Sequence, residues 1–170
     1  VGLVGNDAFG IGDTLTEDRT GVFSEIPRFA PECFAYLHNP SPGNYKRFRR
    51  GLDQLLRGGV VQILDQGEAR AKVPLLAAVG PLQFDVVQYR LQAEYGAESH
   101  LMAAPWVAAR WYRPPAGSPE GWMPVLPEGA AVVADAERRP VVLLPAQLGL
   151  HYLARENAGV VVVRPPPEAQ

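Results

Sequence analysis

Five positively charged side chains lie close together in the sequence and are its best candidates for binding chemistry. They fall within 12 residues: Lys46, Arg47, Arg49, Arg50 and Arg57. The whole chain has a formal net charge of −2, so this stretch is a local concentration of positive charge. Guanidinium and ammonium groups bind phosphate oxygens and position a nucleic acid backbone. The stretch is either a phosphate-facing patch or the solvated face of a helix.

Three tryptophans could add stacking to such a patch. Trp106, Trp111 and Trp122 are spread through the C-terminal half of the chain. Their indole rings either pack in a core or a loop, or stack on bases or on a partner protein.

No residue pattern in the sequence indicates catalysis or a metal site. His38, His100 and His151 are far apart and have no Cys or carboxylate neighbours at ligand spacing. Cys33 is the single cysteine, which excludes an internal disulfide and favours a small buried residue. No GxxxxGK[ST] phosphate loop is present, and the glycines of residues 10–13 are expected in a strand turn. We therefore predict no catalytic, cofactor-binding or metal-binding residue in this chain.

Composition indicates a globular protein. The chain has 170 residues, 47% of them hydrophobic, and lacks the roughly 20-residue apolar run of a membrane span. It also lacks a signal peptide, so we expect a cytoplasmic location. Because Val1 is not a methionine and starts inside an apparent strand, we interpret the sequence as part of a longer protein.

Residues 21–112 show two similar halves. Each half reads as strand, helix, strand: 32–38, 44–57 and 60–65, then 73–79, 82–95 and 100–111. This order predicts an α+β, ferredoxin-like split β-α-β-β-α-β sandwich. Right-handed crossovers would place both helices on one face of the sheet.

Apolar spacing predicts which side chains of the two helices are buried. The first helix would bury Tyr45, Phe48, Leu52, Leu55 and Leu56. The second would bury Phe84, Val87, Leu91 and Tyr95, with Gly96 as its stop.

The remaining chain divides into flanking parts. Residues 1–20 are predicted to be the last strands of a truncated β-barrel domain. Residues 113–170 are predicted to be an α/β extension of the core domain at 21–112. This extension has a Pro/Gly-rich loop at 113–127, a hairpin of strands 130–134 and 141–144, a helix at 145–157 and a strand at 160–163. In that helix, Leu148, Tyr152 and Leu153 should face inward. A loop as long as 113–127 is either functional or poorly ordered.

Four motifs in order carry a family resemblance. They are GDTLTE at 12–17, FSEIPRFAPE at 23–32, GLDQLL at 51–56 and AVGPLQFDV at 78–86. The series closely resembles the C-terminal half of bacterial peptide chain release factor 3, a translational GTPase related to elongation factor G. The last three motifs in combination are specific to that release factor.

The resemblance implies a part of a translation-termination GTPase. Residues 1–20 would be the end of its second-domain barrel, and residues 21–170 its third domain, which docks on the ribosome. The family uses GTP, with Mg²⁺, in an N-terminal domain that is absent here, so this chain is expected to be inactive by itself. The family promotes departure of the stop-codon-reading, class I release factor from the ribosome.

Partners follow from the same resemblance. The domain would contact ribosomal RNA and a small-subunit protein, its own GTPase domain, and the class I release factor indirectly; no DNA or membrane is implied. Lys46, Arg47, Arg49, Arg50 and Arg57 are the candidate ribosomal RNA contacts. Two alternatives stay open, a ferredoxin-like module that senses a small metabolite and a domain of another translational GTPase such as elongation factor G.

Overall fold

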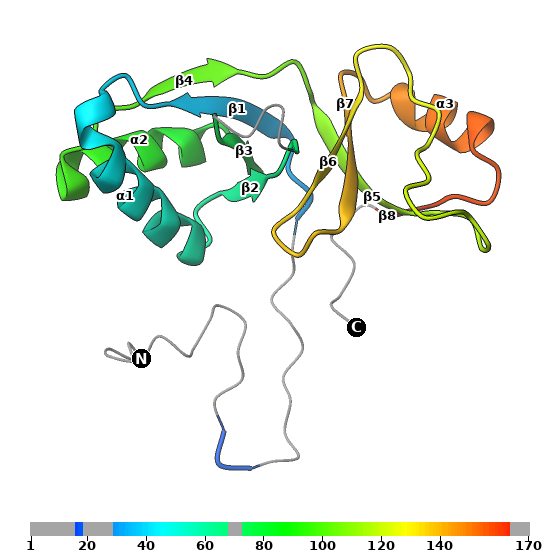
Figure 1. Cartoon of the computed structure of the whole chain (residues 1–170), viewed down its shortest axis with the longest axis horizontal. Coiled ribbons are helices and arrows are strands. Elements are labelled where there is room, and N and C mark those ends of the chain that lie inside the picture. Colours follow the sequence, from blue (N-terminus) through cyan, green and yellow to red (C-terminus); the bar gives the residue numbers. More distant parts are fainter. Residues whose placement is uncertain (1–15, 19–28, 68–72, 164–170) are drawn as a thin grey trace.

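Two four-stranded antiparallel sheets, each with helical cover, form the body of the protein (Figure 1). The computed structural model describes residues 16–18, 29–67 and 73–163. The β-barrel strands predicted in residues 1–20 lie outside the described residues, which include only 16–18 of that segment.

The first sheet confirms the ferredoxin-like prediction. Its elements are β1 (Cys33–His38), a 3-10 turn (Pro42–Asn44), α1 (Tyr45–Arg57), β2 (Gln62–Leu64), β3 (Leu75–Ala78), α2 (Leu82–Tyr95) and β4 (His100–Ala103). The strand order is β2-β3-β1-β4, and every pairing is antiparallel. Both helices cover the same face of this sheet (Figure 1), where their apolar residues form a core with Ala35 and Leu37.

The residues of α2 explain part of the family motif. Phe84, Val87 and Leu91 are buried, as predicted. The side chain of Gln83 accepts hydrogen bonds from the backbone N–H groups of Val79 (2.8 Å) and Gly80 (3.1 Å). Its Nε2 donates to the carbonyl oxygen of Val60 at 2.7 Å. The glutamine of GPLQFDV therefore joins the turn before α2 to the connection between α1 and β2.

The single strand predicted at 100–111 is wrong, because the chain changes sheets in the middle of it. β4 ends at Ala103, and β5 (Ala108–Arg113) belongs to the second sheet. Pro105 lies in the break, where its ring removes a ladder donor. The second sheet has the order β6-β7-β5-β8, with β6 (Ala131–Ala134), β7 (Pro140–Leu144), α3 (Gly149–Glu156) and β8 (Val161–Val163).

Two helix residues predicted to be buried are exposed. Tyr45 is 53% exposed at the first residue of α1, whereas Phe48, Leu52 and Leu55 are buried as predicted. The start of the helix predicted at 145–157 is wrong, because α3 begins at Gly149. Leu148 therefore lies just before the helix and is 78% exposed, whereas Leu153 is buried as predicted.

The two sheets are joined by a shared core and by a polar bridge. Phe34 and Leu75 of the first sheet pack with Trp111 and Val141 of the second. At the edge, Asp65 and Ala134 exchange two backbone hydrogen bonds of 2.8 Å each. Arg138 adds an ion pair to Asp65 at 2.8 Å. These contacts fix the second sheet against the first.

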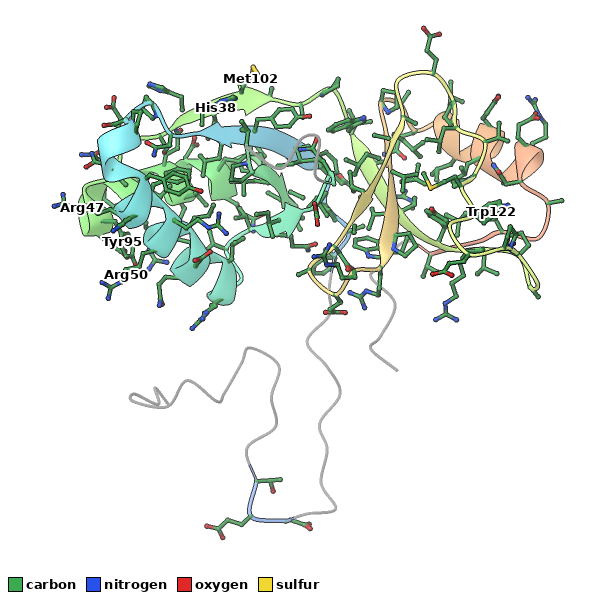
Figure 2. All side chains as sticks on the ribbon, viewed as in Figure 1. His38, Arg47, Arg50, Tyr95, Met102 and Trp122 are labelled. Carbon is green, nitrogen blue, oxygen red and sulfur yellow. The ribbon has the colours of Figure 1, made fainter. Side chains whose placement is uncertain are left out.

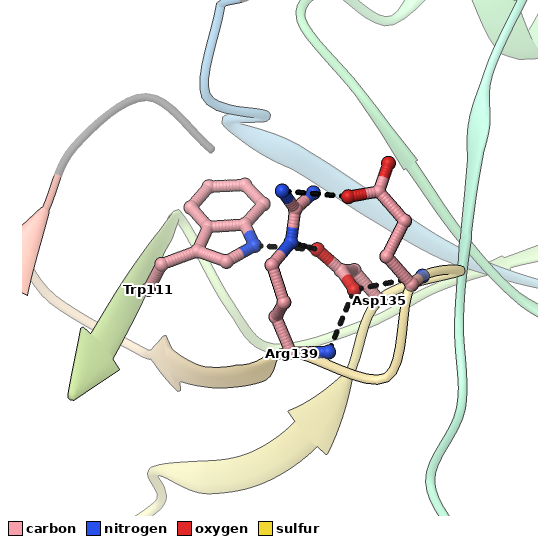
Figure 3. A network of polar contacts seen from close by, with 4 residues as sticks. Trp111, Asp135 and Arg139 are labelled. Atoms are coloured by element: carbon pink, nitrogen blue, oxygen red, sulfur yellow. Dashed lines mark hydrogen bonds and ion pairs between the residues drawn. The ribbon is translucent and has the colours of Figure 1, made fainter. Parts of the chain in front are cut away.

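A carboxylate network closes the turn between β6 and β7 (Figure 3). Asp135 Oδ2 accepts hydrogen bonds from Trp111 Nε1 (2.8 Å) and Arg139 Nε (2.7 Å). Its Oδ1 accepts from the backbone N–H groups of Glu137 (3.0 Å) and Arg139 (2.9 Å). Burial alone would raise the pKa of Asp135, but the hydrogen bonds from Trp111 and Arg139 outweigh it and hold the pKa below its ordinary value.

The long loop at 113–127 is held by specific contacts. Asn157 is buried, and its Nδ2 donates to the carbonyl oxygens of Val125 (2.9 Å) and Leu153 (2.8 Å). Its Oδ1 accepts from the N–H of Val125 at 2.7 Å. Trp122 packs edge-on against Tyr112. These contacts tie the loop to β5 and to the end of α3.

Replacing Asn157 with alanine should lower the free energy of unfolding by about 1.5 kcal/mol, because the buried amide of Asn157 and its hydrogen bonds to the backbone of Val125 and Leu153 are lost. Denaturant unfolding of the chain measures this. Gln147→Ala removes a side chain of equal polarity from an exposed position and should change stability little. Equal effects of the two substitutions would show that Asn157 does not hold the loop.

Candidate functional site

The five basic side chains lie together on the outer surface of α1. Lys46, Arg47, Arg49, Arg50 and Arg57 are all exposed, and we call them the basic face. The helix buries Phe48, Leu52 and Leu55 against the sheet, and at 3.6 residues per turn this leaves Lys46, Arg50 and Arg57 pointing the opposite way. The amphipathic pattern of α1 thus positions the positive charges.

A shallow groove of about 410 Å³ runs along the basic face. It is lined by Tyr45, Lys46, Arg49, Arg50, Asp53, Gln54 and Arg57. Arg49 donates a hydrogen bond to the hydroxyl of Tyr45 at 3.3 Å. Four cations and one carboxylate leave the groove with a net positive charge, which suits a phosphate group.

Arg47 differs from the other four cations. Its Nη1 lies 3.8 Å from the position that a Cβ on Gly96 would occupy, so it approaches the C-terminal end of α2. Arg47, Arg50 and Tyr95 lie at this same end of the molecule (Figure 2). The C-terminus of a helix carries partial negative charge, so Arg47 also stabilises α2. Lys46, Arg50 and Arg57 are therefore the better probes of ligand binding.

The tryptophans do not extend the basic face. Trp106 and Trp111 are buried between the sheets, and the Trp106 indole N–H donates to the carbonyl oxygen of Gly129 at 3.0 Å. Trp122 is half-buried beside Tyr112 in the second sheet's outer core. The packing interpretation is confirmed for Trp106 and Trp111, which cannot stack on a nucleic acid.

Two histidines that are distant in sequence are paired in the sheet. His38 and His100 are opposite each other in the β1–β4 ladder, at the end of one strand and the start of the other. Figure 2 places His38 close to Met102 at this edge of the sheet. The sequence analysis missed the pair because only the strand register brings the two residues together. Within the described ranges, no group of three or more His, Cys, Asp or Glu side chains could hold a metal ion.

Comparison with known proteins decides the family. The model of the family described as "Class II release factor RF3, C-terminal domain" matches residues 23–154. This chain belongs to the release factor 3 family. The match includes the first sheet, strands β5, β6 and β7 of the second sheet and most of α3, and it ends before β8.

Individual relatives agree with the family assignment. Peptide chain release factor 3 of Acaryochloris marina is 41% identical over 157 residues, covering 90% of this chain and 28% of the relative. The release factor 3 of Gloeobacter violaceus is 47% identical over 111 residues, covering 65% of this chain and 21% of the relative. The chain thus spans about a quarter of the length of the curated relatives it matches. Among the alternatives left open by the sequence, the family assignment favours the release factor over a metabolite-sensing module and over a domain of elongation factor G.

Proposed function

We propose that this chain is the ribosome-docking domain of a GTPase that promotes departure of the stop-codon-reading release factor from the ribosome. The observation that carries the proposal is the basic face, because a protein of net charge −2 places five exposed cations on one helix. Such an arrangement binds a phosphate backbone. Ribosomal RNA is the phosphate-rich partner that a release factor meets, and the proposal includes a small-subunit protein as a second partner.

The GTP and Mg²⁺ of the proposed activity do not fit this chain. Its sequence contains no GxxxxGK[ST] loop to cradle phosphates. We therefore assign both to the part of the full-length protein outside this chain, and the class I release factor is reached through the ribosome. Among the described residues, no helix is both long and apolar enough to cross a bilayer. A cytoplasmic location, where ribosomes work, is part of the proposal.

Reversing two charges of the basic face should weaken ribosome association of the full-length protein. We expect Arg50→Glu with Arg57→Glu to reduce the slope of log affinity against log salt by about two, one unit for each lost phosphate contact. Co-sedimentation with ribosomes at several salt concentrations measures this slope.

The matched control reverses two exposed arginines elsewhere, Arg113→Glu with Arg155→Glu, on β5 and α3. This control changes the net charge equally and should leave the slope near that of the unchanged protein. If both double variants lost affinity equally, net charge rather than the basic face would govern binding.

A further inference from the structure

The outward side of α2 carries an apolar stripe that the fold does not use. Leu82 is 74% exposed, Val86 44% and Tyr89 74%. Spacings of four and three residues put them on one helical face, opposite the buried Phe84, Val87 and Leu91. We call Leu82, Val86 and Tyr89 the outer stripe.

The outer stripe is a surface feature of the kind that interfaces show. Single exposed apolar residues are ordinary on any protein, but three on successive turns of one helix form a continuous patch. Polar groups border it, because Asp85 lies on one side and the Arg90–Glu94 ion pair (2.6 Å) on the other. An apolar centre with a polar rim is the arrangement of a protein–protein contact.

The path of the chain indicates what covers the stripe. The N–H of Glu32 donates to the carbonyl oxygen of Ala78 at 3.0 Å, and Cys33 is paired with Ala78 at the start of β1. The chain therefore enters this domain beside Ala78, four residues before Leu82. Phe29, at the start of the described segment, is 67% exposed.

The relatives are longer than this chain, and their additional part is the candidate partner of the outer stripe. The matched domain is the C-terminal one of the family, and the chain covers 28% of a typical relative. The remaining protein therefore precedes this domain in the relatives, and the described chain enters the domain beside Ala78, four residues before the outer stripe begins. A covalently linked neighbour reaches such a surface at high effective concentration.

We propose that the outer stripe of α2 is the docking surface for the preceding part of the full-length release factor, which presents an apolar patch to it. The proposal rests on the proposed function only in taking the full-length protein to carry its GTPase part ahead of this domain. Because α1 packs against α2, docking on the stripe would also fix where the basic face points.

Hydroxyl-radical footprinting of the free full-length protein and of this 170-residue chain tests the proposal. We expect oxidation of Leu82 and Tyr89 to be at least fivefold slower in the full-length protein. Tyr45, an exposed aromatic residue on α1, is the internal control and should react at the same rate in both. Equal rates at Tyr89 in the two proteins would overturn the proposal.

Two other occupants are distinguishable in the same experiment. Protection that appears only after ribosomes are added would assign the stripe to the ribosome. Protection in the 170-residue chain that grows with protein concentration would assign it to a second copy. Either result overturns the proposal.

A charged variant provides the second test. Leu82→Glu with Tyr89→Glu should leave the thermal stability of the 170-residue chain nearly unchanged, because both side chains are exposed. In the full-length protein the variant should raise the oxidation rate of Val86 to that of the 170-residue chain. The Arg50→Glu, Arg57→Glu variant should not change the footprint, so failure of ribosome binding and failure of docking are separable. An unchanged rate at Val86 in the full-length variant would contradict docking through this stripe.

Discussion

Replacing Asp135 with alanine should lower the free energy of unfolding by about 3 kcal/mol, among the largest effects of any polar substitution in this chain. Asp135 is almost fully buried and accepts four hydrogen bonds, from Trp111 Nε1, Arg139 Nε and two backbone N–H groups. The alanine variant leaves the buried Trp111 donor without a partner and removes the carboxylate from Arg139. Denaturant unfolding of the 170-residue chain measures the loss.

The pH dependence gives the same prediction an independent readout. The folded pKa of Asp135 lies below the unfolded one, so its charge stabilises the fold fully above the unfolded value of about 4. That contribution is lost as pH falls through the folded pKa. The difference in unfolding free energy between the unchanged chain and Asp135→Asn should therefore shrink steadily below about pH 4.

Glu128→Ala is the matched control, because Glu128 is an exposed carboxylate in the same sheet region. It should alter stability by less than about 0.5 kcal/mol at any of these pH values. A difference between the Asp135 variants and the unchanged chain that stayed constant from pH 7 to pH 3 would mean that the charge of Asp135 does not contribute.

Local sequence signals were sufficient to predict α1 and α2, the two helices that cover the first sheet. The limits of α2 were predicted correctly, since Pro81 and Gly96 mark its ends and Gly96 adopts the left-handed conformation with φ of 60°. The strand order of the first sheet also followed from the β-α-β-β-α-β sequence, because the right-handed crossover leaves few topologies.

Long-range contacts account for what the sequence did not predict. The strand at 100–111 read as continuous because its apolar pattern ignores which sheet each half joins, although Pro105 was an available signal. The outer stripe was missed for a related reason. Periodicity identified one apolar face of α2, and a second face on the same helix has no partner within the domain to reveal it.

The basic face was predicted as a set of residues but not as a geometry. Charge counting could find Lys46, Arg50 and Arg57, and helical periodicity could place them away from the core. It could not show that Arg47 bends toward Gly96, because the end of α2 reaches that position only after the two helices pack.

Helix packing gives the second large effect, at Gly51. Gly51 lies in α1 where α2 crosses it, and a Cβ at this position would meet Leu91 Cδ2 and the Tyr95 ring at 2.8 Å. Real Cβ atoms essentially never approach a carbon so closely, so Leu91 and Tyr95 would have to move. We expect Gly51→Val to destabilise the chain by about 2 kcal/mol through overpacking.

The stability of Gly51→Ala should fall between that of the unchanged chain and that of Gly51→Val, because the gain of about 1 kcal/mol in helix propensity offsets part of the clash. Gly43→Val is the matched control, since a Cβ on Gly43 meets nothing within 4 Å. Thermal unfolding of the three variants measures the order. Should Gly51→Val prove as stable as Gly43→Val, the helices would not pack as closely as described.

A close crossing has a functional consequence, because α1 carries the basic face and α2 the outer stripe. The larger side chain of Gly51→Val should therefore lower stability and also weaken the proposed ribosome association of the full-length protein, because it would turn the basic face relative to the outer stripe.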